Sequence, residues 1–160
     1  MKILAATDFS EEARPVLDFA ANMVRQCGGK MYLLHAVEPC MLDVEARLTA
    51  DDIAVGLGAI AAVDRECTNR VLAMADNRAK ELAESISRQW GIPIYGKAEE
   101  ADDVTDCVHS FCERHHIDLL VIGNRHHTLL SSLLMGNTAE RMMRSAHIPV
   151  TVVPCKTPEA

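Results

Sequence analysis

Two glycines and an asparagine in the second half of the chain have the types and spacing of a phosphate-binding turn. The apolar run Leu119–Ile122 stops at Gly123, and a second glycine, Gly136, stands directly before Asn137. Asn137 can cap a helix, and Glu140 can complete a capping box. Because the N–H groups at a helix start carry roughly half a positive charge, they attract anions such as phosphate. The alternative is a strand, a surface loop and a capped helix that bind nothing.

This segment resembles the ATP-binding signature of the universal stress protein family, in which Gly, two residues, Gly, nine residues, Gly and then Ser or Thr line the triphosphate. Gly123 matches the first glycine and Gly136 the third, whereas His126 replaces the second glycine and Asn137 replaces the Ser or Thr. Histidine brings a Cβ and an imidazole into space that glycine leaves for a ligand. The pattern therefore favours membership of the family, but it does not decide whether the chain is one of the members that bind ATP.

The resemblance extends to nearly the whole chain through the segments MKILAATDFSEEA, LLHAVEP and HIPVTVVP. It implies a universal stress protein domain over residues 1–155 and a C-terminal tail over residues 156–160. Six cysteines without a CxxC pair are expected to be reduced thiols, with Cys107 and Cys112 in the apolar stripe of a helix.

The resemblance also implies which residues would contact ATP or ADP, with or without Mg²⁺. The segment of Ala6, Thr7 and Asp8 matches the one that contacts the nucleoside, and Ala36 matches the position whose backbone reads adenine. The glycine segment would hold the phosphates. For Asp8 the alternative is a turn residue ahead of Ser10, and His35 is expected to pack within its strand. The full expected set is Ala6, Thr7, Asp8, Ala36, Gly123, His126, Gly136, Asn137 and Thr138.

Apolar runs alternate with long helical patterns along the chain, which predicts an α/β fold. The alternation indicates a single doubly wound, five-stranded parallel sheet with helices on both faces. The family resemblance adds the strand order 3-2-1-4-5 of the adenine nucleotide alpha hydrolase-like fold, which opens a crevice at the carboxyl ends of strands one and four. Strands are expected at Lys2–Thr7, Lys30–Val37, Ile92–Ala98, Ile117–Gly123 and Ile148–Val153, and helices at Ser10–Cys27, Asp64–Trp90, Asp102–His115 and after Gly136.

The connection from Glu38 to Val63 is the hardest segment to assign. It contains MLDVEARLTADDIAVGLGAIAAV, whose helical tendency is interrupted by Gly56 and Gly58. One interpretation is a short helix at Ala50–Val55 followed by a glycine-containing turn. A connector of this length is often a lid or an interaction element.

Composition and charge restrict the location and the partners. A chain of 160 residues with 49% hydrophobic content forms one domain. The net charge of −7 predicts that neither nucleic acid nor a membrane is a partner. The longest uncharged run, Ile53–Val63, is too short to span a bilayer, and the N-terminus has no charged-then-apolar signal pattern. We therefore expect a cytoplasmic protein.

The chain has few of the features that catalysis requires. It contains no GxxxxGK(S/T) loop and no recognisable nucleophile arrangement, so at most slow ATP hydrolysis is expected. The pairs His115/His116 and His126/His127 raise the alternative of a metal- or redox-responsive regulator. No cysteine or carboxylate stands at ligand spacing from them, so no metal site is predicted.

The leading interpretation is a cytoplasmic, homodimeric universal stress protein that binds an adenine nucleotide and signals through protein contacts. The alternative is a dimeric family member that has lost nucleotide and acts only through protein–protein contacts. The predicted dimer uses the edge strand Ile148–Val153, whose unpaired N–H and C=O groups can pair with the same strand of a second copy. Alternatively, Pro149 and Pro154 protect this edge and leave a monomer.

Overall fold

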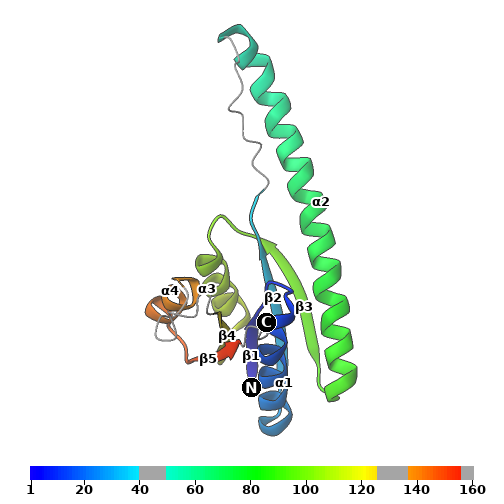
Figure 1. Cartoon of the computed structure of the whole chain (residues 1–160), viewed down its shortest axis with the longest axis vertical. Helices are drawn as coiled ribbons and strands as arrows, with labels where there is room; N and C mark the ends of the chain where they lie inside the picture. Colours follow the sequence, from blue (N-terminus) through cyan, green and yellow to red (C-terminus); the bar gives the residue numbers. More distant parts are fainter. Residues whose placement is uncertain (40–49, 126–136, 156–160) are drawn as a thin grey trace, which may run out of the picture.

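Five parallel strands form one sheet in the order β3-β2-β1-β4-β5 in this computed structural model (Figure 1). The structure describes residues 1–39, 50–125 and 137–155. The strand order and the parallel pairing confirm the predicted fold class. No described helix combines the length and the apolar character that a membrane span requires.

Strands β1 and β2 lie where the sequence predicts them, whereas the three later strands begin and end two residues further along. The apolar residues that suggested earlier starts, Ile92 and Ile117, are buried in the core but precede the first paired residues of β3 and β4. The strands are β1 (Lys2–Ala6), β2 (Lys30–Val37), β3 (Ile94–Glu100), β4 (Leu119–Arg125) and β5 (Val150–Cys155). The helices are the 3-10 turn η1 (Glu11–Ala13), α1 (Arg14–Cys27), α2 (Ala50–Trp90), α3 (Val104–His115) and α4 (Asn137–Ser145).

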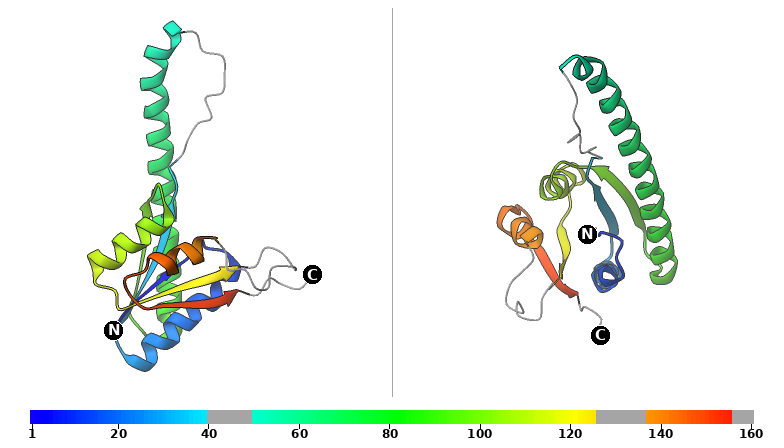
Figure 2. Two further views of the ribbon diagram at one scale, coloured as in Figure 1. Left: turned by 90° about the vertical axis from the view of Figure 1, so that its left-hand side faces the viewer. Right: turned by 45° about the horizontal axis from the view of Figure 1, so that its top comes forward.

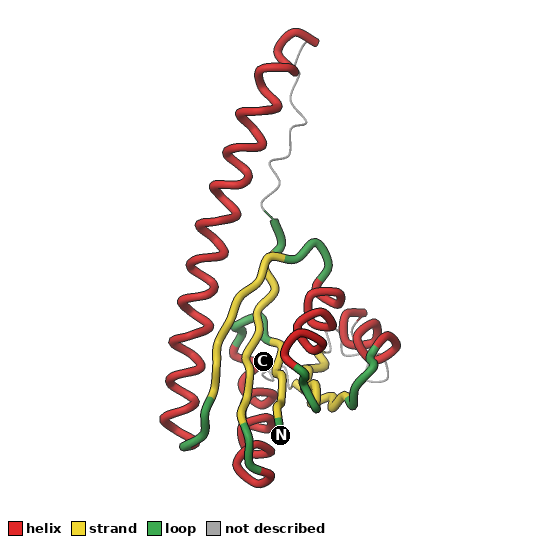
Figure 3. Tube along the Cα trace, turned by 180° about the vertical axis from the view of Figure 1, so that it is seen from behind, coloured by secondary structure: helices red, strands yellow, loops and turns green. Residues whose placement is uncertain are grey.

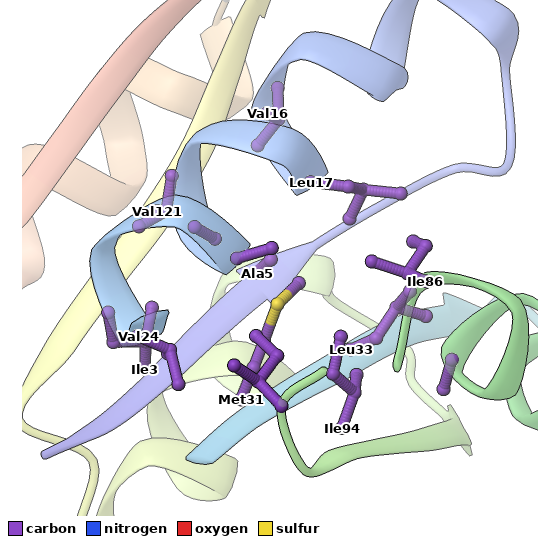
Figure 4. Close-up of a cluster of buried hydrophobic side chains, with 14 of the residues drawn as sticks. Ile3, Ala5, Val16, Leu17, Val24, Met31, Leu33, Ile86, Ile94 and Val121 are labelled. Carbon is purple, nitrogen blue, oxygen red and sulfur yellow. The ribbon is translucent and has the colours of Figure 1, made fainter. Parts of the chain in front are cut away.

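The helices cover both faces of the sheet and so create two core layers (Figure 2). Successive side chains of a strand point to opposite faces, so Ile3 and Ala5 pack with α1 and α2, whereas Leu4 packs with α3 and α4. Figure 4 shows the first layer, where Val16 of α1 and Ile86 of α2 meet the strands. Both faces are therefore apolar, as a parallel sheet requires.

Helix α2 differs most from the sequence prediction. It is one helix of 41 residues from Ala50 to Trp90, so the predicted start at Asp64 and the interpretation of a short helix with a glycine turn are both wrong. Gly56 and Gly58 each cost only about 1 kcal/mol in a helix, and no proline interrupts this segment. Its C-terminal part covers β2 and β3, while its N-terminal part extends past the end of the sheet (Figures 1 and 3).

Candidate functional site

A cavity of about 530 Å³ lies at the carboxyl ends of β1, β2 and β4. This is the point where the connections after β1 and β4 leave in opposite directions, and open α/β sheets bind their ligands there. The volume lies within the usual range for small-molecule sites. The cavity is lined by Ala6, Thr7, Asp8, Ala13, Val16, Leu34, His35, Ala36, Val104, Val108, Ile122, Gly123, Asn137, Thr138, Ala139, Met142 and Cys155.

The structure brings together the predicted site residues that it describes. They come from the end of β1 and its following turn, from β2, from β4 and from the first turn of α4. Two further residues of the predicted set, His126 and Gly136, lie outside the described residues. The predicted residues that line the cavity are Ala6, Thr7, Asp8, Ala36, Gly123, Asn137 and Thr138.

The turn after β1 is held by short side-chain hydrogen bonds. Asp8 Oδ1 accepts from Ser10 N at 3.1 Å and from Ser10 Oγ at 2.8 Å. Thr7 Oγ1 accepts from Phe9 N at 3.1 Å, and Phe9 has a φ of 62°. Asp8 therefore has the turn role that the sequence suggested as an alternative, and the same turn places it at the cavity.

His35, which the sequence predicts to pack within its strand, lines the cavity. Its Nδ1 lies 2.8 Å from Thr7 O, and its ring lies 4.2 Å from the ring of Phe9. Because a carbonyl oxygen only accepts, Nδ1 carries the proton of this hydrogen bond. The bond joins the end of β2 to the turn after β1. Its position directly before Ala36 was the available sequence signal.

Helix α4 is tied to the start of α3 through Arg141, its fifth residue. Asp103 Oδ1 caps α3 by accepting from Thr105 N at 2.8 Å and from Asp106 N at 3.2 Å. Its Oδ2 accepts from Arg141 Nη2 at 2.6 Å. The Arg141 guanidinium, assisted by the backbone donors, holds the pKa of Asp103 below its usual value. This contact fixes where the N-terminus of α4 lies relative to the sheet.

The capping box predicted for α4 takes a different form. The helix begins at Asn137, which is its first residue. Glu140 Oε1 accepts from Arg144 Nε at 2.9 Å, one turn further along the helix, rather than from the N-terminal turn as predicted. The N–H groups of the first turn point out of the N-terminal end of α4, which lines the cavity. The helix dipole favours an anion at this end.

Gly123 has a packing role that the motif alone does not reveal. A Cβ at this position would lie 2.7 Å from Cys155 Sγ and 3.1 Å from Val16 Cγ2. The glycine thus lets β5 and α1 approach β4 at the base of the cavity. Cys155 is buried and lines the cavity, although no sequence pattern assigns it to the site.

Two thiols of α3, Cys107 and Cys112, behave as small apolar groups. None of the cysteines in the described ranges forms a disulfide. Burial raises the pKa of Cys112 to about 11 and also raises that of Cys107, so both stay protonated at neutral pH. They pack with the α3 and α4 core layer, which confirms the predicted stripe. Among residues 1–39, 50–125 and 137–155, no group of three or more His, Cys, Asp or Glu could hold a metal ion.

A comparison with known proteins identifies the family of this fold and cavity. The family model of the universal stress protein family matches residues 1–154. The chain belongs to the universal stress protein family. It is 26% identical over 152 residues to "Universal stress protein MJ0531" of Methanocaldococcus jannaschii, which covers 95% of this chain and 81% of that protein.

Solved structures of the family share the fold. The universal stress protein UspA from Lactobacillus plantarum matches with a TM-score of 0.70 and 18% identity, over 96% of this chain and 97% of that one. A universal stress protein from Archaeoglobus fulgidus in complex with dAMP matches with a TM-score of 0.57 and 23% identity, over 95% of this chain and 96% of that one. The adenine nucleotide alpha hydrolase-like fold is therefore common to these proteins.

Proposed function

We propose that this universal stress protein binds an adenine nucleotide, ATP or ADP, in the cavity at the carboxyl ends of β1, β2 and β4. The observation that carries the proposal is the convergence of seven predicted residues, from four separate parts of the chain, on one cavity of about 530 Å³. The solved relative with dAMP supports the same ligand class.

The two ends of the cavity suit the two ends of a nucleotide. Apolar side chains, including Leu34, Val104 and Val108, form a surface against which a purine ring can pack. Asp8, at the turn after β1, offers carboxylate oxygens to the ribose. The first turn of α4, at Asn137 and Thr138, directs N–H groups towards the phosphates.

Binding rather than catalysis is the role that these residues support. Asp8 is the one carboxylate among the lining residues, so Mg²⁺ would be held mainly by the phosphates and by water. Among the described lining residues, His35 could act as a base and Cys155 as a nucleophile, but the two belong to separate strands and are not paired with each other as catalysis requires. The protein would therefore act in the cytoplasm as a nucleotide-dependent signalling module that works through protein contacts.

Calorimetric titration with ATP, ADP, AMP and GTP tests the proposal. We expect saturable binding of adenine nucleotides and weaker binding of GTP. Asp8→Ala should reduce the affinity by the equivalent of about 1 to 3 kcal/mol, because a polar group of the nucleoside loses its partner. Glu84→Ala is the matched control, since Glu84 is exposed on α2 and does not line the cavity. Absence of saturable binding at millimolar nucleotide with Mg²⁺ would reject the proposal.

A second candidate function is favoured by one residue of the signature. His126 replaces the second glycine, which favours a family member that works through protein contacts without nucleotide. His126→Gly separates the two. A gain of ATP affinity in this variant indicates that histidine alone obstructs an otherwise intact site. Continued absence of binding in both proteins favours the nucleotide-free function.

Dimerisation through β5 is the partner contact proposed for either function. The residues Val150, Thr151, Val152 and Val153 are only half-buried in the single chain. Pairing of β5 with its copy about a two-fold axis would satisfy the outer backbone groups of this edge. Val152→Lys should lower the mass measured by light scattering, with circular dichroism confirming that the variant is folded. A variant that stays fully dimeric contradicts this interface.

A further inference from the structure

The turn that follows β1 lies between the candidate nucleotide cavity and a second cleft. Thr7 and Asp8 line the cavity, whereas the next two residues, Phe9 and Ser10, line the cleft. The cleft has a volume of about 660 Å³, and Arg78 of α2 also lines it. This turn therefore links α2 to the cavity.

Phe9 has a backbone conformation that its residue type disfavours. Its φ is 62°, in the left-handed region, where a bulky side chain is rare. Such a conformation persists only where surrounding contacts fix it, and it occurs preferentially at ligand sites. Both backbone groups of Phe9 are held: its N–H donates to Thr7 Oγ1 at 3.1 Å, and its C=O accepts from Arg78 Nη2 at 3.2 Å. One of these two contacts comes from α2.

The Phe9 ring contacts a ring of the cavity and a cation of α2. Its centroid lies 4.2 Å from that of the His35 ring, with 31° between the two planes. Arg78 Cζ lies over the Phe9 ring, 4.9 Å from its centroid. Both contacts are attractive in this geometry, and Phe9 is also packed against the core layer of α1 and α2. Arg78, Phe9 and His35 thus form a continuous contact series from α2 to the cavity.

His35 is the member of this series that lines the cavity, directly before Ala36. Its Nδ1 donates to Thr7 O at 2.8 Å, so Nε2 of the neutral ring is an acceptor. The hydrogen bond and the contact with Phe9 together hold the ring in one orientation. An acceptor held in this way suits the adenine amino group or a ribose hydroxyl, because a preorganised partner loses little conformational freedom on binding.

We propose that Phe9 and Arg78 are positioning residues of the nucleotide cavity, which act through His35 and couple the cavity to α2. The inference rests on the proposed nucleotide binding. Arg78 is not among the residues that line the cavity, so it acts through Phe9. Helix α2 continues from Arg78 past the end of the sheet (Figure 1). A protein partner that moves α2 would change the orientation of His35, and bound nucleotide would bias the position of α2 by the same coupling.

Nucleotide affinity in variants of the two positioning residues tests the proposal. Phe9→Gly keeps the left-handed backbone, which glycine adopts freely, and removes the ring. We expect about three- to tenfold weaker ATP binding in calorimetry for this variant and for Arg78→Ala. Phe9→Tyr and Arg78→Lys, which retain a ring and a cation, should recover affinity. The matched control is Arg88→Ala, an exposed arginine of α2 that lines neither the cavity nor the cleft. Unchanged ATP affinity in either Phe9→Gly or Arg78→Ala overturns the proposal.

NMR of the free protein tests the same contacts without nucleotide. The His35 ring protons lie beside the Phe9 ring, so Phe9→Gly should shift their resonances. Arg78→Ala should shift the same resonances, although Arg78 reaches His35 only through Phe9, whereas Arg88→Ala should leave them unchanged. His35 resonances that Arg78→Ala does not move overturn the proposal. If they move while the native chain binds no nucleotide, the proposed function is rejected and the coupling of α2 to His35 stands, so the two failures are distinguishable.

Discussion

The two edges of the sheet are completed in different ways. At β3, the backbone of α2 lies so close that a Cβ on Gly96 would be 2.0 Å from Ala79 O, and Asp76 accepts from Ala98 N at 3.0 Å. At β5, the residues before Cys155 are half-buried or exposed, and no described element lies beyond the strand. The chain therefore packs the backbone of α2 closely against the face of one edge strand and pairs an N–H of that strand with the Asp76 side chain, whereas it leaves apolar surface on the other edge strand.

This difference is also visible in the glycines nearest the two edges. Gly96 of β3 meets the backbone of a helix, which cannot rotate away. Gly123 of β4 meets the ends of two side chains, Cys155 and Val16, which can change rotamer. The β3 side is thus expected to resist substitution, whereas the β5 side, beside the candidate site, is expected to adjust.

The largest effect is predicted for Gly96→Ala. Its methyl group would overlap the Ala79 carbonyl, so either β3 or α2 must move, at a cost of about 3 kcal/mol or more in the free energy of unfolding. Urea denaturation measures the loss. Gly91→Ala is the matched control, because Gly91 has a φ of 66° but no atom within 4 Å of its Cβ position. That variant should cost only about 1 to 2 kcal/mol for the left-handed backbone.

If Gly96→Ala were no more destabilising than Gly91→Ala, the close packing of the α2 backbone against Gly96 of β3 would be contradicted. Hydrogen exchange can localise the effect. Protection should fall in β3 and in the C-terminal part of α2, while the amides of β4 and β5 keep theirs, because stability is lost locally at this edge.

A smaller loss is predicted for Asp76→Ala. The substitution removes the acceptor of Ala98 N and the carboxylate that pairs with Lys80 and Lys97. Both lysines are about half exposed, so the hydrogen bond to the edge strand should dominate a loss of about 1 to 3 kcal/mol. Asp76→Asn retains an acceptor oxygen and should lose less. If both variants lost the same unfolding free energy, the stabilisation would come from the charge of Asp76 and not from its hydrogen bond to Ala98 N.

The sheet could be predicted because the sequence signals for its strands are local and recur along the chain. Each buried run, such as Lys30–Val37, ends in a turn or a helix signal, and the alternation alone selects a parallel sheet. The full length of α2 could not be predicted, because Gly56 and Gly58 weaken the helical pattern while helix propensity in the segment around them outweighs their cost. Likewise, nothing in the sequence shows that Gly96 faces the backbone of α2.

The sequence predicts those residues of the candidate site that match positions of the family signature. It does not predict the residues that reach the site only through contacts formed on folding. Asp8 and Ala36 were expected and line the cavity. His35 and Cys155 were not expected, because their roles depend on a hydrogen bond to Thr7 O and on the close approach of β5 to Gly123. Such contacts join residues far apart in the sequence, so a local pattern does not reveal them.

Acid should weaken the β3 edge selectively. The hydrogen bond with Lys80 and the other donors hold the pKa of Asp76 at about 2, below its ordinary value of 3.8. Because the folded pKa is depressed, this stabilisation is complete above pH 3.8 and is lost as the pH falls towards 2. The difference in unfolding free energy between the native chain and Asp76→Asn, about 1 kcal/mol at neutral pH, should therefore narrow over that interval. A constant difference down to pH 2 would exclude this titration.

The smallest effect is predicted for Gly123→Ala, on the adjustable side of the sheet. The new Cβ would lie 2.7 Å from Cys155 Sγ, but a thiol can rotate away, so the expected loss is about 1 kcal/mol. In a double-mutant cycle, Cys155→Ala removes the sulfur atom and should cancel most of this loss, because the two changes share one contact. No comparable single side chain can be removed to relieve Gly96→Ala, whose obstacle is backbone. If Gly123→Ala were as costly as Gly96→Ala and insensitive to Cys155→Ala, the β5 side would be as rigid as the β3 side. The contrast between the two edges would then be wrong.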